Sequence, residues 1–352
     1  MVNALHEGER LGMQCVQVFT KNQQQWAVKP LDEAMVRDWL AELRRLGWDA
    51  GGPDGRGGVV SHASYLINLA SLDETLWRRS VDLMTVEIER CEALAIPYLV
   101  HHPGAAVGGD AAGGVRRIAR AYGELASRTK GFKTISCFEG TVGAGSQLGG
   151  TFEQLAALAA ASAEAGFDAA RIGFCLDTCH MHAAGYDLSS DGAAREALAA
   201  FDRICGAGRL KVLHLNDSKG KAGSKLDRHE HIGEGWIGGG ASKHTGAGTF
   251  DAGVLSRSGF KAVLERAAGL PKILETPKGN APDGTPWDRV NLDRLCGLLG
   301  ESAPAWKAEP GAATTQPRPR KKPTAARAAG RTAGARSPKA RPTPKKANKR
   351  GR

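Results

Sequence analysis

Short apolar runs alternate with longer amphipathic segments along most of this chain, and this alternation limits the possible folds more than any other feature. Seven runs are rich in Val, Ile, Leu and Phe: residues 15–20, 57–63, 97–102, 133–140, 171–180, 210–217 and 271–276. Parallel strands buried on both faces have this continuous apolar character, and helices join them. The pattern therefore predicts an α/β fold, either an open doubly wound sheet or a (β/α)8 barrel.

The segments around the runs predict helices at residues 3–12, 31–47, 72–95, 114–130, 152–166, 193–205 and 254–269. In the second of these, apolar residues three and four apart form one buried face: Val36, Trp39, Leu40, Leu43 and Leu46. A helix, not a strand, is predicted ahead of the first run. We therefore expect a barrel that lacks its first strand, with two unpaired edges facing each other.

Composition divides the chain into two parts. From about residue 303 the sequence consists mainly of Pro, Ala, Thr, Gly, Lys and Arg, which cannot bury enough apolar surface to offset the entropy of ordering. Residues 311–352 hold 14 of the 48 Lys and Arg and no acid, which leaves 34 basic and 37 acidic residues in 1–310. We predict a folded domain at 1–302 and a disordered basic tail at 303–352, which is either a nucleic-acid arm or a solubilising tail.

Two other features bear on location. The seven cysteines form no CxxC pair, and their odd number argues against a disulfide framework, so a reducing cytoplasm is expected. No run of eighteen apolar residues occurs, and the N-terminus lacks the apolar core of a signal peptide, so neither a membrane span nor a membrane partner is expected.

Polar side chains at the ends of the predicted strands indicate the chemistry, because a parallel barrel builds its site from the carboxyl ends of its strands. Six of the seven strands end in possible metal ligands, and a loop adds two more: His62, His101 or His102, Glu139, Asp177 with His180, His214, Glu275, and the loop residues Asp227 and His229. Each alone is better explained as a core, capping or rim residue. Their repetition at one end favours a shared site.

The ligand types narrow the metal. Imidazole and carboxylate without thiolate suit zinc, manganese or iron. When one of the adjacent histidines is counted, five His, two Asp and two Glu remain, enough for three ions if one carboxylate bridges a pair. Such clusters polarise a phosphodiester and activate water, which indicates a phosphoryl-transfer hydrolase.

Several motifs resemble the endonuclease IV family, the metal-dependent apurinic/apyrimidinic endonucleases of base-excision repair. The similar stretches are VFTKNQQQW (18–26), SHASYLINLAS (61–71), HHPG (101–104), FCLDTCHMHAAGYDL (174–188), HLNDSKGKAGSKLDRHEHIGEG (214–235) and ILET (273–276). The resemblance extends over about residues 3–300. It implies a TIM barrel with three zinc ions, of which part could be Mn²⁺ or Fe²⁺.

The resemblance also implies a ligand set. His62, His102 and Glu139 would hold the first ion; Glu139 would bridge to a second held by Asp177, His214 and Glu275; and His180, Asp227 and His229 would hold the third. The HPG and DRH contexts select His102 over His101 and His229 over His231, so that His101, His182 and His231 become neighbours of the site or rim residues.

The implied reaction is attack by an activated water on the phosphate 5′ to an abasic deoxyribose, which leaves a 3′-hydroxyl. Glu139 and Glu275 would be catalytic and position that water. The implied partner is double-stranded DNA with abasic sites, bound by a monomer that is cytoplasmic and nucleoid-associated. The basic tail would contact DNA phosphates.

The resemblance assigns DNA contacts to two loops. Tyr65 and Leu66 match the loop that the family inserts into the duplex, and Lys21, Asn22, Gln24 and Trp26 match the preceding DNA-facing loop, with Gln24 where a basic residue is often found. Two departures from the family occur. The strand with a G-x-H-x-S pattern is missing, and Gly140 and Thr141 follow Glu139 where the family tends to have Asn-Thr.

Two alternatives stay open. A metal-dependent sugar isomerase or epimerase on a related barrel needs one ion, two carboxylates and two histidines, and would leave His180, Asp227 and His229 without a role. A catalytically inactive relative would bind DNA through the barrel or the tail.

Overall fold

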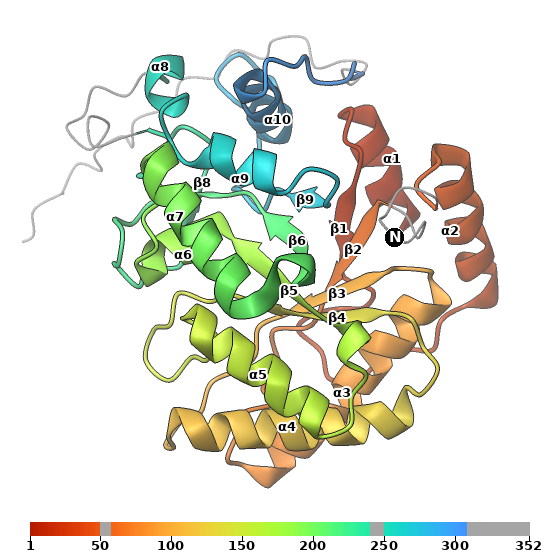
Figure 1. Ribbon diagram of the computed structural model, residues 1–352. Coiled ribbons are helices and arrows are strands. Elements are labelled where there is room, and N and C mark those ends of the chain that lie inside the picture. The colour runs from red at the N-terminus through yellow and green to blue at the C-terminus, as the bar shows by residue number, and fades with distance from the viewer. Residues whose placement is uncertain (50–57, 240–249, 308–352) are drawn as a thin grey trace, which may run out of the picture. The chain divides into compact units, whose positions relative to one another are not determined.

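The computed structural model describes residues 1–49, 58–239 and 250–307. Their main element is a parallel sheet with the strand order β1-β2-β3-β4-β5-β6-β9 (Figure 1). The seven strands are β1 (Val16–Val18), β2 (Val59–His62), β3 (Tyr98–His101), β4 (Ile135–Glu139), β5 (Ile172–Asp177), β6 (Leu210–His214) and β9 (Lys272–Ile273). The strand order of a doubly wound sheet reverses at one point, whereas this order follows the sequence throughout. The sheet is therefore a nearly closed TIM barrel. Each predicted apolar run contains one strand, so these predictions are confirmed.

Helices connect the strands on the outside of the sheet. They are α1 (Val2–Arg10), α2 (Glu33–Leu46), α3 (Glu74–Ala93), α4 (Ala111–Arg128), α5 (Phe152–Glu164), α6 (Thr178–Ala184), α7 (Asp191–Phe201), α8 (Ala252–Leu255), α9 (Phe260–Arg266) and α10 (Trp287–Leu298). Short 3-10 or π turns and a two-stranded hairpin complete the elements: η1 (Ala169–Arg171), η2 (Asp202–Gly206), η3 (Ala207–Arg209), β7 (Asp217–Ser218) and β8 (His229–Glu230). The seven predicted helical segments are confirmed, although 254–269 divides into α8 and α9. Helices α6 and α10 were not predicted.

Helix α2 shows how local sequence sets an element. The Asp32 side chain accepts hydrogen bonds from the first free backbone N–H groups, and Gly47, at φ +66°, ends the helix in a left-handed conformation. Trp39 and Leu43 on the predicted apolar face are buried. The Trp39 indole donates to the Leu94 carbonyl, so the largest side chain of this face satisfies its one donor.

The predicted strand at 171–180 is wrong at its end. Strand β5 stops at Asp177, and α6 begins at once. The Asp177 carboxylate accepts from the His180 backbone N–H at 2.9 Å and caps the new helix. The alternative of a capping role for Asp177 is therefore correct in the fold, and the short helix also places His180 over the same end of the barrel.

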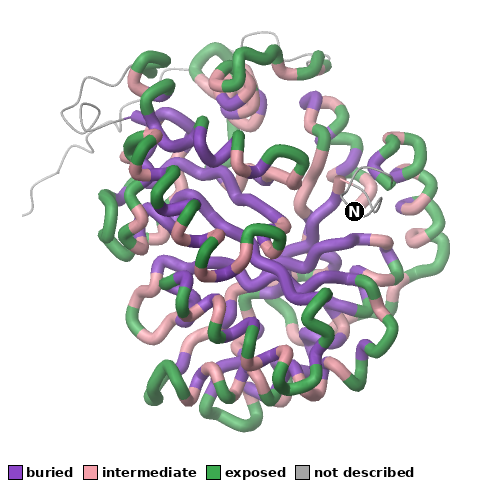
Figure 2. Tube along the Cα trace, in the orientation of Figure 1, coloured by how far each residue is buried: buried purple, intermediate pink, exposed green. Residues whose placement is uncertain are grey.

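The sheet has two apolar faces with period-two alternation. The outward face packs under the helices in the larger cluster, which includes Val59, Leu99, Phe138 and Leu176. The inward face forms a separate buried layer: Val60, Tyr98, Val100, Ile135, Cys137, Cys175, Val212 and Ile273, with Cys15 against it. Figure 2 shows the strands as almost continuously buried. Burial on both faces explains why the strand segments are apolar runs.

The edges of the sheet are β1 and β9, which have strand partners on one side only in the described part of the chain. Two side-chain bonds connect these edges. The Cys15 thiol donates to the Lys272 carbonyl at 3.3 Å, and Gln17 Nε2 donates to Glu275 Oε1 at 2.5 Å. The expectation of seven strands with two unpaired edges facing each other is confirmed.

The domain boundary at residue 302 stays a prediction, but the described residues just beyond it contact the barrel. Residues 303–307 have no regular structure but bind to the barrel: the Lys307 N–H donates to the Arg10 carbonyl at 2.7 Å, and Arg289 donates to the Pro304 carbonyl. The rest of the predicted tail lies outside the described residues. No helix in the described ranges combines the length and apolar character that a membrane crossing requires.

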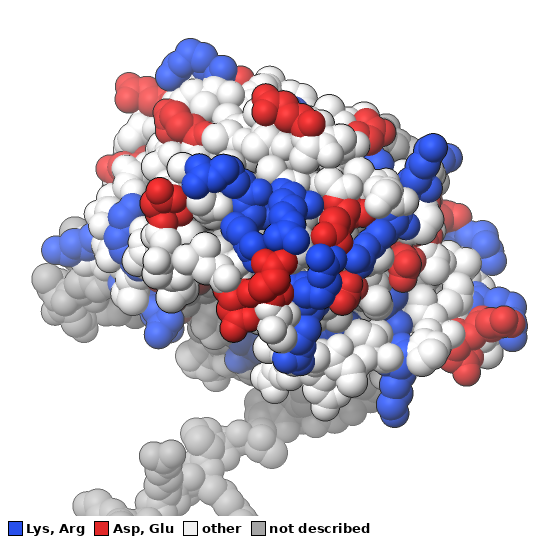
Figure 3. All heavy atoms as spheres, turned by 90° about the horizontal axis from the view of Figure 1, so that it is seen from below, with Lys and Arg blue, Asp and Glu red and all other residues white. Residues whose placement is uncertain are grey.

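The face seen from below in Figure 1 carries basic and acidic side chains side by side (Figure 3). Helices α3 and α4, which lie along the lower side of Figure 1, are joined by ion pairs, including Arg78 with Glu124 at 2.5 Å and Arg128 with Asp82 at 2.7 Å. Arg117 and Arg120 both reach Glu74. The paired charges agree with the near balance of acids and bases in residues 1–310.

Candidate metal centre

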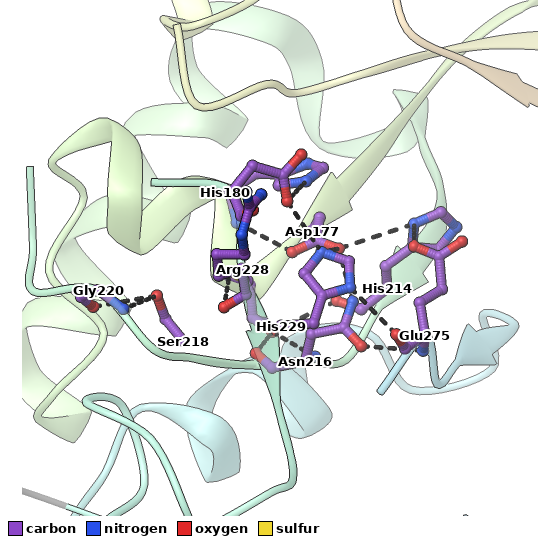
Figure 4. A network of polar contacts seen from close by, with 12 residues as sticks. Asp177, His180, His214, Asn216, Ser218, Gly220, Arg228, His229 and Glu275 are labelled. Atoms are coloured by element: carbon purple, nitrogen blue, oxygen red, sulfur yellow. Dashed lines mark hydrogen bonds and ion pairs between the residues drawn. The ribbon is translucent and has the colours of Figure 1, made fainter. Parts of the chain in front are cut away.

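The predicted ligands form a layer directly above the inward apolar layer of the barrel. At the end of six strands, or directly after it, the ligand follows an inward apolar residue by two positions: Val60 and His62, Val100 and His102, Cys137 and Glu139, Cys175 and Asp177, Val212 and His214, Ile273 and Glu275. Side chains two apart on a strand share a face, so the parallel strands deliver these groups to one end. Figure 4 shows Asp177, His180, His214, His229 and Glu275 converging there.

The first group consists of His62, His102 and Glu139, whose ligand atoms lie within 4.8 Å of one another. Glu139 Oε2 is 3.1 Å from His62 Nε2 and 3.2 Å from His102 Nε2. Glu139 is fully buried, and His102 lies at the edge of the site.

The second group consists of Glu139, Asp177, His214 and Glu275. His214 Nδ1 lies 3.1 Å from Glu139 Oε1, 3.1 Å from Glu275 Oε2 and 3.8 Å from Asp177 Oδ2. Because the two oxygens of Glu139 face different histidines, its carboxylate would be able to bridge two cations.

The third group consists of His180, Asp227 and His229. Asp227 Oδ1 is 3.3 Å from His180 Nε2 and 3.5 Å from His229 Nε2. His229 Nε2 also lies 3.6 Å from Asp177 Oδ2, next to the second group. The structure thus brings together all nine side chains predicted as ligands.

The outer nitrogens of the histidines determine which ring atom is available. Three of them bond to a backbone carbonyl, which only accepts: His62 Nδ1 to Ala63 at 2.7 Å, His180 Nδ1 to Gly140 at 2.9 Å and His229 Nδ1 to Glu275 at 3.2 Å. The outer nitrogen must carry the hydrogen, so the inward nitrogen of each neutral ring presents a lone pair.

These lone pairs point at carboxylate oxygens, which cannot donate to them. The arrangement is favourable only when a positive charge lies between, either a proton on the imidazole or a metal cation. His229 Nε2 is buried and has no hydrogen-bond partner, as expected for an atom whose partner is a cation. The donor set therefore fits divalent metal ions with imidazole and carboxylate ligands.

The pKa directions agree with this electrostatic arrangement. Burial tends to raise the pKa of Glu139, but the facing His102 and His214 rings hold it well below its usual range. Burial tends to lower the pKa of His180, but Asp177 and Asp227 raise it well above the ordinary value. Without metal, these directions favour an ionised Glu139 carboxylate and a protonated His180 ring.

Two thiols lie within reach of the ligand groups and were not predicted. Cys175 accompanies Glu139 and His214, and Cys179 accompanies Asp177 and His229. Burial raises the pKa of each thiol to about 12, so both are neutral at ordinary pH when no metal is bound. Period-two spacing before Asp177 could have identified Cys175.

The other histidines of the motifs lie outside the groups. His101 is buried against Tyr122 Oη at 2.8 Å and Ser136, His182 accepts from the Leu188 N–H, and His231 stacks on Trp287 with ring centroids 3.8 Å apart. None of the three belongs to a group that could hold a metal among the described residues. Their positions agree with the prediction that they are not ligands.

The loop after β2 lies over the first group. Tyr65 is 59% exposed, with its ring centroid 5.1 Å from that of His62 and 5.8 Å from that of His102. Leu66 is half-buried beside it. A pocket of about 190 Å³ lies next to these residues and includes Asn68 in its wall.

The loop after β1 differs from the prediction at Lys21. Its side chain is only 4% exposed, and the ammonium donates to the carbonyls of Asn22 and Gln25. Lys21 therefore braces the loop from inside and does not present its charge to a phosphate. Asn22 and Gln24 are exposed, and Trp26 is half-buried under the Arg79 guanidinium at 4.2 Å.

Asn216 is a polar contact that sequence reasoning missed. Its Nδ2 donates to Asp177 Oδ2 at 2.6 Å, and its Oδ1 accepts from the Glu275 N–H at 2.9 Å (Figure 4). One buried amide thus orients a ligand of β5 and the backbone after β9. Its place two residues after His214, on the same face, was the available signal.

Known proteins with similar sequences share this architecture. A family model described as xylose isomerase-like TIM barrel matches residues 5–242. Proteins named probable endonuclease 4 from Chloroflexus aggregans and Geobacter sulfurreducens are each 38% identical, and the alignments cover 83% and 86% of this chain and 91% and 92% of theirs. Among solved structures, endonuclease IV from Thermus thermophilus has a TM-score of 0.64 at 31% identity and covers 85% of this chain and 93% of its own.

Proposed function

Because the chain belongs to the endonuclease IV family of the xylose isomerase-like TIM barrels, we propose that it hydrolyses the phosphodiester 5′ to an abasic site in duplex DNA and leaves a 3′-hydroxyl. The observation that carries the proposal is the gathering of three ligand groups, connected through Glu139 and Asp177, at one end of the barrel. One chain provides all of them, which supports activity as a monomer.

We assign three zinc ions, or in part Mn²⁺ or Fe²⁺, to these groups. Bound divalent cations polarise a phosphodiester and lower the pKa of water. The first group would hold one ion through His62, His102 and Glu139. The second would use Glu139, Asp177, His214 and Glu275, and the third His180, Asp227 and His229.

The carboxylates position the attacking water in this proposal. Glu139 Oε1 and Glu275 Oε2 each lie 3.1 Å from the same atom, His214 Nδ1, so they face one space from two strands. Acceptors on two sides of that space can orient a water and receive its proton. The buried Glu139 excludes bulk water from below, and the solvent-facing mouth admits the phosphate.

Tyr65 and Leu66 are proposed to enter the duplex at the lesion. An exposed ring on a loop beside the first group could stack on a neighbouring base, and an abasic nucleotide loses least on leaving the stack because it has no base to unpair. Asn22, Gln24 and Trp26 would contact the same strand, whereas Lys21 would act only by shaping the loop.

The basic segment from residue 311 onward is proposed as a DNA arm, and with a DNA substrate we infer a cytoplasmic, nucleoid-associated protein. Each neutralised phosphate contributes about −0.9 to the slope of log affinity against log salt. Deletion of residues 311–352 should therefore reduce the salt slope for binding to undamaged duplex and leave cleavage of the lesion unchanged. An unchanged salt slope would rule out the arm.

The decisive experiment uses a duplex with one synthetic abasic site. Purified protein should cut 5′ to the site, the cut should stop after exhaustive chelation and return with Zn²⁺, and a duplex without the site should stay intact. His6→Asn replaces an exposed histidine of α1 outside the ligand groups, controls for the loss of a histidine as such, and should cut normally. Binding without cleavage would indicate the inactive relative instead. Turnover of a ketose with one ion per chain would indicate an isomerase or epimerase, although that reaction has no use for the third group.

A further inference from the structure

Gln17 occupies the position in β1 that metal ligands occupy in the other six strands. Cys15 packs against the inward apolar layer, and Gln17 follows it by two residues, as each strand-borne ligand follows its own inward residue. The neighbours Val16 and Val18 pack instead into the outer cluster. Gln17 is therefore the seventh member of the ligand layer, although a carboxamide is a weaker metal ligand than imidazole or carboxylate.

The contacts of Gln17 connect two ligands of the second group. Gln17 Nε2 donates to Glu275 Oε1 at 2.5 Å, and Gln17 Oε1 lies 2.9 Å from His214 Nε2. The two bonds determine each other's direction. An ionised carboxylate only accepts, so the amide NH₂ must face Glu275, and the amide oxygen must then face His214.

The amide oxygen in turn determines the His214 tautomer. Because it only accepts, His214 Nε2 must carry the hydrogen, and Nδ1 is left facing Glu139, Asp177 and Glu275. The same amide holds Oε1 of Glu275, so that Oε2 is the oxygen turned toward Nδ1.

We propose that Gln17 is a positioning residue that sets the ring of His214 and the carboxylate of Glu275 for one metal ion. The inference rests on the proposed function, because it assumes that the second group binds a cation. It goes beyond the proposed function because it gives β1 a role in the site, although this strand provides no metal ligand.

His214 differs from His62, His180 and His229 in the group that bonds to its outer ring nitrogen. The outer nitrogens of His62, His180 and His229 bond to backbone carbonyls, which no substitution removes. The outer nitrogen of His214 bonds to a side chain, so its tautomer depends on residue 17. Glu275 also follows the edge strand β9, which among the described residues pairs only with β6. The bond from Gln17 therefore connects Glu275 to β1 across the gap between the two edges.

The test is Gln17→Met, which keeps the length and removes both polar contacts. Zn²⁺ is titrated against a chromophoric chelator into metal-free full-length protein. Loss of a partner that orients a ligand typically weakens metal affinity about 10–100-fold. We expect one of the zinc equivalents to weaken by about this factor and the others to keep the wild-type affinity. Gln14→Met, exposed just before β1, is the matched control and should bind like wild type.

A second variant separates the two contacts and guards against a folding defect. Gln17→Glu keeps an acceptor for His214 Nε2–H but places a carboxylate against Glu275. In zinc-loaded protein labelled with ¹⁵N-histidine, wild type and Gln17→Glu should both show His214 bound through Nδ1, whereas Gln17→Met should lose that signal or show a mixture. Gln17→Glu should nevertheless bind the same zinc equivalent with lower affinity than wild type does.

Two results would overturn the inference, and they can be distinguished. If wild type binds several zinc ions and Gln17→Met binds them equally well with an unchanged His214 spectrum, Gln17 has no positioning role and the proposed function stands. If wild type itself binds no zinc at the second group, the proposed function and this inference fail together.

Discussion

Zinc binding to the metal-free protein at pH 7 should release about three protons. The structure gives the reason, because the inward nitrogens of His62, His180 and His214 face carboxylate oxygens at 3.1–3.3 Å. Without metal, a proton must occupy each of these contacts. A cation that binds the same nitrogen must displace it.

The count comes from the three imidazoles whose pKa is raised. Burial lowers the pKa of His62, but Glu139 raises it above the ordinary value, and Asp177 and Asp227 do the same for His180. Burial also lowers the pKa of His214, and its neighbours Cys175 and Glu275 raise it well above the ordinary value. Since the Cys175 thiol, with its pKa of about 12, is neutral at pH 7, we attribute the effect on His214 to the carboxylates.

The assay is isothermal titration calorimetry of Zn²⁺ into metal-free protein at pH 7, in buffers with different enthalpies of ionisation. The observed enthalpy plotted against the buffer enthalpy has a slope equal to the number of protons released. His62→Gln should lower that number by about one, because one displaced proton is lost with the ring. A slope near zero with full zinc binding would show that the imidazoles are already neutral without metal, and would refute the reasoning.

Three further outcomes follow from the same contacts. Glu139→Gln should slow cleavage at an abasic site on the order of 10³-fold, because it removes several kcal/mol of charge stabilisation from the carboxylate shared by the first and second groups. Incision assays with saturating Zn²⁺ would detect this loss, and a variant that cuts at full speed would exclude Glu139 from catalysis. The metal-free protein should lose stability as the pH rises above about 6.5. An imidazole with a raised pKa stabilises the fold fully below its unfolded pKa and loses that contribution as the pH passes its folded pKa. The urea midpoint measured with chelator should therefore fall over this range, and the midpoint measured with zinc should not. Asp217→Asn should lower the free energy of unfolding in urea by about 2–4 kcal/mol. Each carboxylate oxygen of Asp217 accepts two backbone N–H bonds, and the amide NH₂ of an asparagine would face one of these pairs of donors. A decrease below about 0.5 kcal/mol would contradict this.

The strands, and the side chains that gather at their carboxyl ends, could be predicted from the sequence because they depend on a local pattern. A buried parallel strand is a continuous apolar run, and a charged or imidazole side chain at its carboxyl end stands out against that run. His62, Glu139 and His214 are all of this kind. The family resemblance then separated His102 from His101, which the pattern alone could not do, because the two are adjacent.

The remaining features depend on contacts between distant segments. Lys21 was assigned to DNA from its motif, but whether an ammonium points outward depends on which carbonyls the loop turns toward it. Asp177 was predicted as a ligand, but the strand was predicted to continue to residue 180, whereas the Asp177 side chain caps a helix that begins at Thr178. The boundary at residue 302 followed composition, whereas Lys307 is held by Arg10, at the opposite end of the folded domain's sequence.

Gln17 and Asn216 show why amides are harder to identify than ligands. A glutamine in a strand is unremarkable by type, and its role appears only when its face of the strand and the level of the neighbouring ligands are both known. Period-two alternation gives the face, since Val16 and Val18 lie in the outer cluster. Parallel register agrees with the level, since Gln17 pairs with Val60, two residues before His62, by the same offset as His62 pairs with Val100, two residues before His102. Cys15 packs on the apolar layer below. A search for polar residues at the ligand level of every strand, and not for metal-binding residue types alone, would therefore find the side chains that determine which atoms a ligand offers.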